Sequence, residues 1–288
     1  MMAHRPKRAV VFSGGGGRGA YECGVYKYLE EADLAPDILV GTSIGAVNAA
    51  AIASGKSAAD LERAWLDTRT GDIQRFWRLR RWGAIFDTSP WYRTLQRFID
   101  FDNLSASDKR LMITATEVET GSLRVFDNQH TDLTPAHIIA SCSIPLVYPW
   151  TKIDGYHYWD GAVMANTPLA GAIDAGAEEV LVVLLSPVGA QQITAPRWPW
   201  DAFAVMLELA MSATFENDVK QLENVNRLVA AQLDEKHRAV RCRVIAPSRE
   251  TGLLRILRYE PRVSQELIDL GYADARRVIE DDPTPPDN

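Results

Sequence analysis

Two short glycine-containing segments near the start of the chain have residue types suited to acyl transfer. The first, residues 41–45, reads Gly-Thr-Ser-Ile-Gly and lies between an apolar run and a run of small residues. This order predicts a strand, a sharp turn and a helix, a context that exposes Ser43 as a nucleophile. The flanking Gly41 and Gly45 suit such an elbow, because glycine tolerates positive φ and close backbone approach.

The second segment, residues 13–19, reads Ser-Gly-Gly-Gly-Gly-Arg-Gly between an apolar run and a helical pattern. Its backbone N–H groups can converge on an anion in front of the helix. One use is a dinucleotide site, since the segment contains G-x-G-x-x-G; the other is an oxyanion hole for a nearby nucleophile. A dinucleotide site needs an acidic residue about 20 positions further on. The second strand ends instead in Gly41-Thr42-Ser43, which counts against NAD.

A base must accept the serine proton, and Asp160 is the preferred candidate. It ends a short predicted strand, 156–159, next to aromatic side chains that would desolvate the carboxyl and raise its pKa. An ordinary Asp-Gly turn is the structural alternative. Among the five histidines, His157 is the best imidazole candidate because it is close to Asp160. An esterase of the α/β-hydrolase type with a Ser-His-Asp triad therefore stays open, although Ser43 follows only one predicted strand, earlier than is usual there.

The elements that must position these residues alternate between strand and helix over the first 55 residues. This alternation predicts an α/β fold, a three-layer sandwich whose central, mainly parallel sheet is flanked by helices. We find no internal repeat or linker, so residues 1–288 are predicted to form a single domain. The acidic, proline-rich residues 281–288 are expected to be a disordered tail. Further strands are expected at 110–117, 123–126, 180–185 and 240–245, and helices at 134–141, 170–175, 200–233 and 264–279.

Composition narrows the class of protein. The chain is 47% hydrophobic with a mean hydropathy of -0.15, as in soluble globular proteins. A net charge of -7 argues against a nucleic-acid partner. The three cysteines are far apart, so neither a metal site nor a disulfide framework is predicted. The N-terminal apolar run is too short for a signal peptide, and no run approaches the ~20 residues of a membrane span. A cytoplasmic protein, with peripheral membrane contact at most, is expected.

Four motifs together resemble the patatin-like phospholipase family. They are the glycine-rich loop 13–19, the elbow 41–45, the stretch Ala140-Ser141-Cys142-Ser143-Ile144-Pro145 with Tyr148-Pro149, and Asp160-Gly161-Ala162 followed by Asn166 and Pro168. Their order and spacing agree across residues 9–185, which would form the catalytic core, with 186–280 as a mostly helical continuation of the same domain. Ser13 departs from the resemblance, because many family members carry Asp there.

The resemblance implies a Ser–Asp dyad, with Ser43 as nucleophile and Asp160 as base. It also implies an oxyanion hole built from Gly14, Gly15, Gly16, Gly17 and the backbone of Arg18. The implied reaction is hydrolysis of fatty-acyl esters of phospholipids or related lipids through an acyl-serine intermediate, without metal or cofactor. A non-catalytic nucleotide- or lipid-binding module is the remaining alternative.

Two further segments bear on the substrate. Residues 65–101 are rich in Trp and Arg, which suits either a lid facing an anionic bilayer or a helical cap with buried tryptophans. Residues 203–233 carry Met206, Leu207, Leu209, Met211 and Phe215, which suit a packing helix or a methionine-lined acyl channel.

Overall fold

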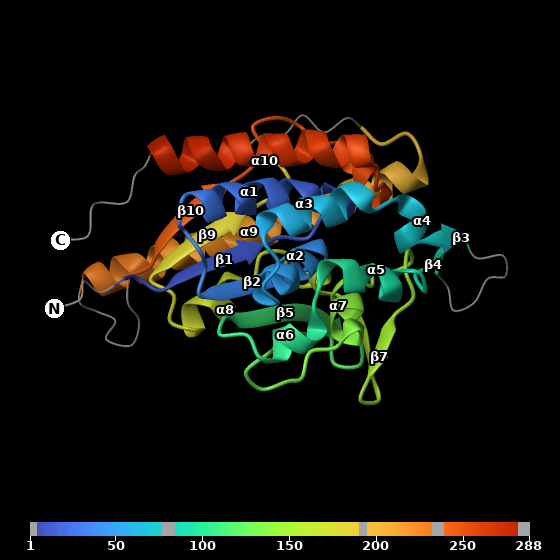
Figure 1. The fold of residues 1–288 in the computed structure, drawn as a ribbon, viewed down its shortest axis with the longest axis horizontal. Coiled ribbons are helices and arrows are strands. Elements are labelled where there is room, and N and C mark those ends of the chain that lie inside the picture. The colour runs from blue at the N-terminus through green and yellow to red at the C-terminus, as the bar shows by residue number, and fades with distance from the viewer. Residues whose placement is uncertain (1–4, 77–83, 190–194, 232–238, 282–288) are drawn as a thin grey trace.

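A computed structural model describes residues 5–76, 84–189, 195–231 and 239–281 (Figure 1). Its main sheet has eight strands in the order β10-β9-β1-β2-β5-β8-β7, with β6 paired to β5 beside this path. The strands are β1 (Arg8–Phe12), β2 (Ile38–Thr42), β5 (Arg110–Glu117), β6 (Ser122–Asp127), β7 (Thr151–Ile153), β8 (Tyr156–Asp160), β9 (Glu179–Val183) and β10 (Arg241–Ile245).

The longer helices are α1 (Ala20–Glu31), α2 (Ile44–Ala53), α3 (Ala58–Asp67), α5 (Trp91–Phe98), α9 (Pro199–Ala230) and α10 (Pro261–Asp281). Shorter helical segments are η1 (Gly16–Gly19), α4 (Thr70–Ile73), α6 (Phe101–Ser105), α7 (Pro135–Ser141), η2 (Gly161–Val163), α8 (Leu169–Asp174) and η3 (Leu253–Leu257). Within the described ranges, no helix is both long and apolar enough to cross a bilayer.

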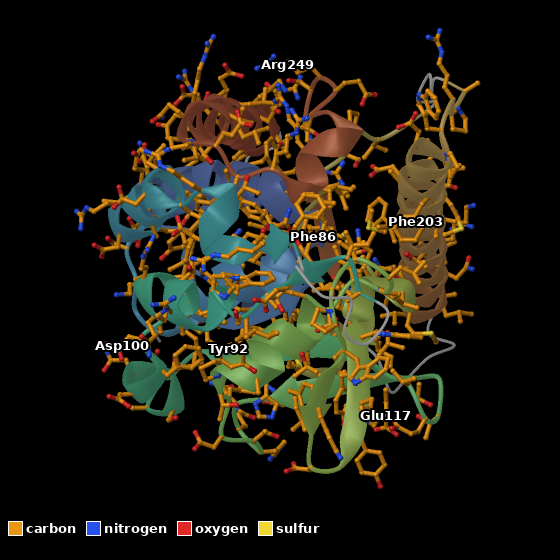
Figure 2. All side chains as sticks on the ribbon, turned by 90° about the vertical axis from the view of Figure 1, so that its right-hand side faces the viewer. Phe86, Tyr92, Asp100, Glu117, Phe203 and Arg249 are labelled. Carbon is orange, nitrogen blue, oxygen red and sulfur yellow. The ribbon has the colours of Figure 1, made fainter. Side chains whose placement is uncertain are left out.

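Strands β10, β9, β1, β2 and β5 are mutually parallel. The three central strands β9, β1 and β2 are buried along their whole length, as expected when helices cover both faces of a sheet. Alternate residues face two separate cores: Val10 and Phe12 pack with α1, α2 and α3, whereas Ala9 and Val11 pack with α8 and α9. Figures 1 and 2 show these layers from two sides, with α9, which carries Phe203, opposite α1 and α3. The predicted three-layer, mainly parallel α/β architecture is confirmed.

The other half of the sheet is antiparallel and brings distant segments together. Strand β6 pairs with β5 over Met112 to Glu117 and so occupies one edge of β5 there. The other edge is shared: β2 pairs with β5 as far as Thr114, and β8 continues from Ala115. Because β8 runs antiparallel to β5 and ends at Asp160 opposite Ala115, its carboxyl end meets that of β2, which ends at Thr42 opposite Thr114.

Several boundaries differ from the sequence-based expectations. Helix α10 continues through Asp281, so that residue belongs to a helix and not to the predicted tail, while 282–288 lie outside the described residues. Strand β7 and the two-stranded ribbon β3 (Arg75–Phe76) with β4 (Phe86–Asp87) were not predicted. These strands have only two or three residues, too few to show a periodic pattern.

Candidate active site

Ser43 occupies the elbow between β2 and α2 in a strained conformation. Its φ is 55° and its ψ is -125°, a region that serine rarely adopts. The two flanking glycines are needed for close packing: a Cβ on Gly41 would lie 2.5 Å from the Gly45 carbonyl oxygen, and one on Gly45 would lie 2.4 Å from that of Phe12. Of the two roles predicted for these glycines, close backbone approach is therefore the one observed.

Asp160 reaches Ser43 because of the strand register. Thr42 pairs with Thr114 of β5, and Asp160 pairs with Ala115, the next residue along the same edge. The Ser43 hydroxyl and the Asp160 carboxyl line the same cleft, and Ser43 is close enough to lower the pKa of that carboxyl. The second carboxylate interaction comes from the Ala162 N–H, which donates to Oδ1 at 2.8 Å. The predicted pair is thus brought together from opposite halves of the sheet.

The environment of Asp160 suits a base. The side chain is buried, and desolvation raises the pKa of its carboxyl from 3.8 to about 7. The nearby Ser43 hydroxyl and the hydrogen bond from the Ala162 N–H lower this pKa without cancelling the rise. A carboxyl with a pKa near 7 can accept a proton from serine and return it at neutral pH.

The end of α7 fixes both members of the pair. Ser141 Oγ accepts a 2.8 Å hydrogen bond from the Ser43 backbone N–H, and the Ser143 carbonyl oxygen accepts one of 2.9 Å from the Asp160 N–H. Between them, the Cys142 thiol contacts the Ser43 side chain, and burial holds its pKa well above the usual value. The stretch from Ala140 to Pro145 therefore has a structural task that sequence reasoning did not assign.

The glycine loop supplies fewer free donors than the five predicted. The Gly14 N–H donates to Asn166 Oδ1 at 2.9 Å, and the Arg18 N–H donates to the Gly15 carbonyl at 3.3 Å. Gly15 and Gly16 line the cleft with Ser43, and no partner for either N–H is found among the described residues. Gly16 has a φ of 59°, and a Cβ there would lie 2.0 Å from the Ile256 carbonyl oxygen. The donors facing Ser43 are thus those of Gly15 and Gly16.

A buried polar network holds the loop against the nucleophile helix. Asn48 of α2 donates to the Gly19 carbonyl at 2.9 Å and to Glu22 Oε2 at 2.7 Å. It also accepts a 3.0 Å hydrogen bond from Trp65 Nε1. Complete burial raises the pKa of the Glu22 carboxyl well above its ordinary value. The network fixes η1 relative to the helix that starts after Ser43.

The Arg18 side chain points away from Ser43 and anchors α9. Its Nη2 lies 3.1 Å from Glu208 Oε2, and both side chains are almost completely buried. Its Nη1 donates to Ser186 Oγ at 3.0 Å. Glu208 occupies the buried stripe of α9, where an acidic residue needs such a partner. The ion pair therefore joins the glycine loop to the helix that covers the cleft.

The cleft around Ser43 is narrow, with a volume of about 20 Å³, and its walls are mostly apolar. These walls come from segments far apart in the sequence, and Leu207 and Met211 of α9 form one side. Besides the groups already described, the lining side chains are Ile144, Pro145, Ala162, Val163 and Ile256. The arrangement offers a nucleophile, a base and backbone donors to an ester with a hydrocarbon chain.

The described histidines lie elsewhere. His157 Nδ1 pairs with Glu119 at 2.6 Å, on the opposite face of β8 from Asp160. His137 bonds through Nδ1 to the Thr134 N–H at 3.0 Å and so contributes to the predicted cap of α7. Among the described residues, no histidine lines the cleft. His4 and His237 lie outside the described residues.

The Trp/Arg-rich segment 65–101 is partly a packed cap. Trp65 and Trp91 are buried, with Trp65 stacked on Tyr259. Trp77 and Trp82 lie outside the described residues. The two described tryptophans of this segment are thus core residues and do not face a bilayer.

Comparison with known proteins gives the family. A model of the patatin-like phospholipase family matches residues 10–173, which include the glycine loop, Ser43 and Asp160. The chain belongs to the patatin-like phospholipase family. The patatin-like part contains both members of the candidate dyad, whereas α9 and α10 lie beyond it.

The curated relatives of this patatin-like chain are mostly longer. It is 28% identical to a cGAMP-activated phospholipase of Escherichia coli strain TW11681 over 56% of this chain and 53% of that protein. It is 29% identical to Patatin-like phospholipase domain-containing protein 6 of Mus musculus over 65% of this chain and 14% of that protein. The crystal structure of VipD from Legionella pneumophila has a similar fold, with a TM-score of 0.50 and 11% identity over 97% of this chain and 68% of that one.

Sequence reasoning gave no role to three residues that support the site, Ser141, Asn166 and Glu208, and it named Met211 only within a packing helix or acyl channel. Ser141 and Asn166 lay within recognised motifs but had no role assigned. Glu208 had a detectable signal, because it is an acidic residue within an otherwise apolar helical stripe. The contacts of all four depend on chain segments that are distant in sequence.

Proposed function

We propose that the chain is a serine acyl hydrolase in which Ser43 is the nucleophile and Asp160 the base. The observation that carries the proposal is that the strand register brings Ser43 and the buried Asp160 carboxyl into one cleft, where burial raises the pKa of Asp160 to about 7. Ser43 also stands at the N-terminus of α2, where the helix dipole favours developing negative charge. Family membership supports the same chemistry.

In the proposed reaction, Ser43 Oγ attacks the ester carbonyl carbon while its proton passes to Asp160. The carbonyl oxygen becomes an oxyanion, which the N–H groups of Gly15 and Gly16 stabilise. When this intermediate collapses, the alcohol leaves with the proton from Asp160 and an acyl-serine ester remains. A water molecule then attacks this ester as Asp160 takes its proton, and Ser43 departs with that proton as the free acid is released.

We propose fatty-acyl esters of phospholipids or related lipids as the substrate class. The apolar side chains around Ser43 suit a hydrocarbon chain, and the family relatives are phospholipases by name.

We further propose that substrate reaches the cleft from a lipid surface. Leu146 follows the cleft residues Ile144 and Pro145, has a φ of 68° and is 63% exposed. A positive φ is costly for leucine, and it turns an apolar side chain toward the solvent at the mouth of the site. Val163 lines the cleft and is also exposed, as is Phe76 of the adjoining ribbon. This apolar rim, and not the buried tryptophans, would contact the lipid.

Labelling with a fluorophosphonate tests the dyad. The wild type should form a covalent adduct, Ser43→Ala should form none, and Asp160→Asn should react at least about 100-fold more slowly because the base is lost. Circular dichroism of all three proteins checks that they are folded. Absence of a Ser43-dependent adduct on folded protein would contradict the proposal, and a normal rate in Asp160→Asn would remove the base assignment.

A further inference from the structure

A second chamber, of about 210 Å³, lies at the carboxyl ends of β1 and β9, next to the cleft. The segment after β9, residues 184–189, forms one wall and α9 forms the other. Gly14 and Asn166, which are hydrogen-bonded to each other, line this chamber, whereas Gly15 and Ser43 line the cleft. The glycine loop thus stands between two compartments.

Met211 of α9 joins these compartments, because its side chain lines both. It is buried, and its unbranched thioether side chain can change rotamer at little cost. No other residue in the described part of the chain lines both cavities. A hydrocarbon chain in the cleft can therefore reach the chamber when the Met211 side chain changes rotamer.

The chamber walls suit an uncharged chain. Leu184, Leu185, Val188 and Phe215 contribute apolar surface. Arg18 is the one cation among the described lining residues, and its guanidinium is held by Glu208, Ser186 and the Gly15 carbonyl. Glu208 and Glu216 add negative charge to the walls. A phosphate would have to displace Glu208 from Arg18, so an anionic headgroup is disfavoured here.

Ser13 adds to the chamber wall a buried hydroxyl that is not engaged by any described residue. It is fully buried, and its Oγ has no hydrogen-bond partner among the described residues. A buried hydroxyl without a partner is unfavourable, and an acceptor on a ligand would relieve that cost. The scissile carbonyl would already face Gly15 and Gly16. A donor on the other side of the loop therefore suits a second carbonyl.

We propose that the chamber holds the acyl chain that stays on the lipid while Ser43 attacks the other one. Ser13 Oγ donates to the carbonyl of the uncleaved ester, and the hydrocarbon chain lies between residues 184–189 and α9. This inference rests on the proposed serine hydrolase activity and makes a diacyl lipid the preferred substrate.

The first test compares esters with ethers. Medium-chain phosphatidylcholine in detergent micelles is compared with its two analogues in which one ester is replaced by an ether. The wild type should cleave the diester about fivefold faster than the analogues, since each lacks the second carbonyl. In Ser13→Ala this preference should disappear. Thr167→Val is the matched control, because Thr167 Oγ1 is also buried without a partner but does not line the chamber, and it should keep the preference.

The second test fills the chamber. Ser212 of α9 lines it, so Ser212→Trp should lower the ratio of kcat/KM for medium-chain diacylglycerol to that for a short p-nitrophenyl ester by about tenfold. The control is Leu228→Trp, an exposed site on the same helix outside the chamber, which should leave the ratio unchanged.

Three results would overturn the proposal. The first is a diester preference that survives in Ser13→Ala. The second is a Ser212→Trp variant that loses as much activity on a long monoacyl ester as on the diacyl lipid. The third is an enzyme that cleaves the short ester but turns over neither diacyl lipid. The second result would assign the chamber to the cleaved chain. Failure of the proposed hydrolase activity is distinct, because Ser43-dependent cleavage of the short ester would then be absent as well.

Discussion

The two ends of strand β8 carry the two residues that sequence reasoning weighed as bases. His157 is more than one-third exposed, pairs with Glu119 and packs against Trp150. Asp160, three residues further on, is buried against Ser43 with its pKa raised to about 7. The strand alternation places them on opposite faces, and only one face lies under helix α9 and the elbow. Under the proposed mechanism, solvent exclusion, and not residue type, would select the base.

The largest effect is expected at the buried end. Asp160→Asn keeps the size of the side chain and removes the base, so kcat on a short-chain ester should fall by about 10³-fold or more. Ser43→Ala should have at least as large an effect. Steady-state kinetics measure the loss of kcat in both variants. If activity were retained in Asp160→Asn and lost in His157→Gln, His157 and not Asp160 would be the base.

The same substitution should stabilise the fold. The folded carboxyl has a pKa of about 7, against 3.8 for an aspartate exposed to solvent, so the folded chain binds this proton more tightly than the unfolded chain does. The stability contribution is therefore present below pH 3.8 and is lost as the pH rises through 7. Asp160→Asn should raise the free energy of unfolding at pH 8 by up to about 4 kcal/mol. In urea unfolding at pH 5, the increase in the free energy of unfolding should be less than half of that at pH 8. An equal increase at both pH values would contradict the raised pKa of Asp160 as its cause.

Ser141 tests how the pair is held. Ser141→Ala removes the acceptor of the Ser43 N–H and leaves that buried donor unpaired, so kcat should fall about 10- to 100-fold with little change in KM. Ser143→Ala is the matched control. Its hydroxyl is also buried but bonds to the Ile139 carbonyl and Thr151, so kcat should change much less. Equal losses of kcat in the two variants would show that α7 acts only through general stability.

The pH profile should follow Asp160. Because only the deprotonated carboxylate accepts the serine proton, kcat/KM should fall about tenfold per unit as the pH drops below 7. The profile of His157→Gln should keep the same midpoint. A midpoint near 4 in the wild type would mean that the carboxyl is more hydrated than its burial indicates.

The smallest effect is expected at the exposed end of β8. His157→Gln removes the pairing with Glu119, far from the cleft residues, so kcat/KM should stay within about twofold of the wild type. The p-nitrophenyl ester assay is sufficient, and a loss of more than about tenfold would revive a triad mechanism.

Sequence reasoning found the parts of the site whose signals are local. Ser43 follows a strand and precedes a helix, and Asp160 ends a strand, so residue order alone predicted both positions. The glycine run predicted a loop with free backbone donors. Only the structure shows that the Gly14 N–H donates to Asn166, 152 residues further along the chain. Ser141 and Glu208 could not be assigned because their partners are 98 and 190 residues distant. The tryptophans of 65–101 had an ambiguous pattern, since aromatic residues at helical spacing suit both a core and a membrane face.

The shared edge of β5 also has a consequence for biosynthesis. Ser43 belongs to the first parallel strands, whereas Asp160 joins them only after β8 has paired at Ala115. Under the proposed mechanism, a nascent chain that ends before β8 carries a nucleophile without its base. Helix α9, which closes the cleft and supplies Glu208, is made later still. A lipid-degrading activity would thus stay silent during most of translation, and the order of the strands along the chain would protect the membranes of the cell that makes it.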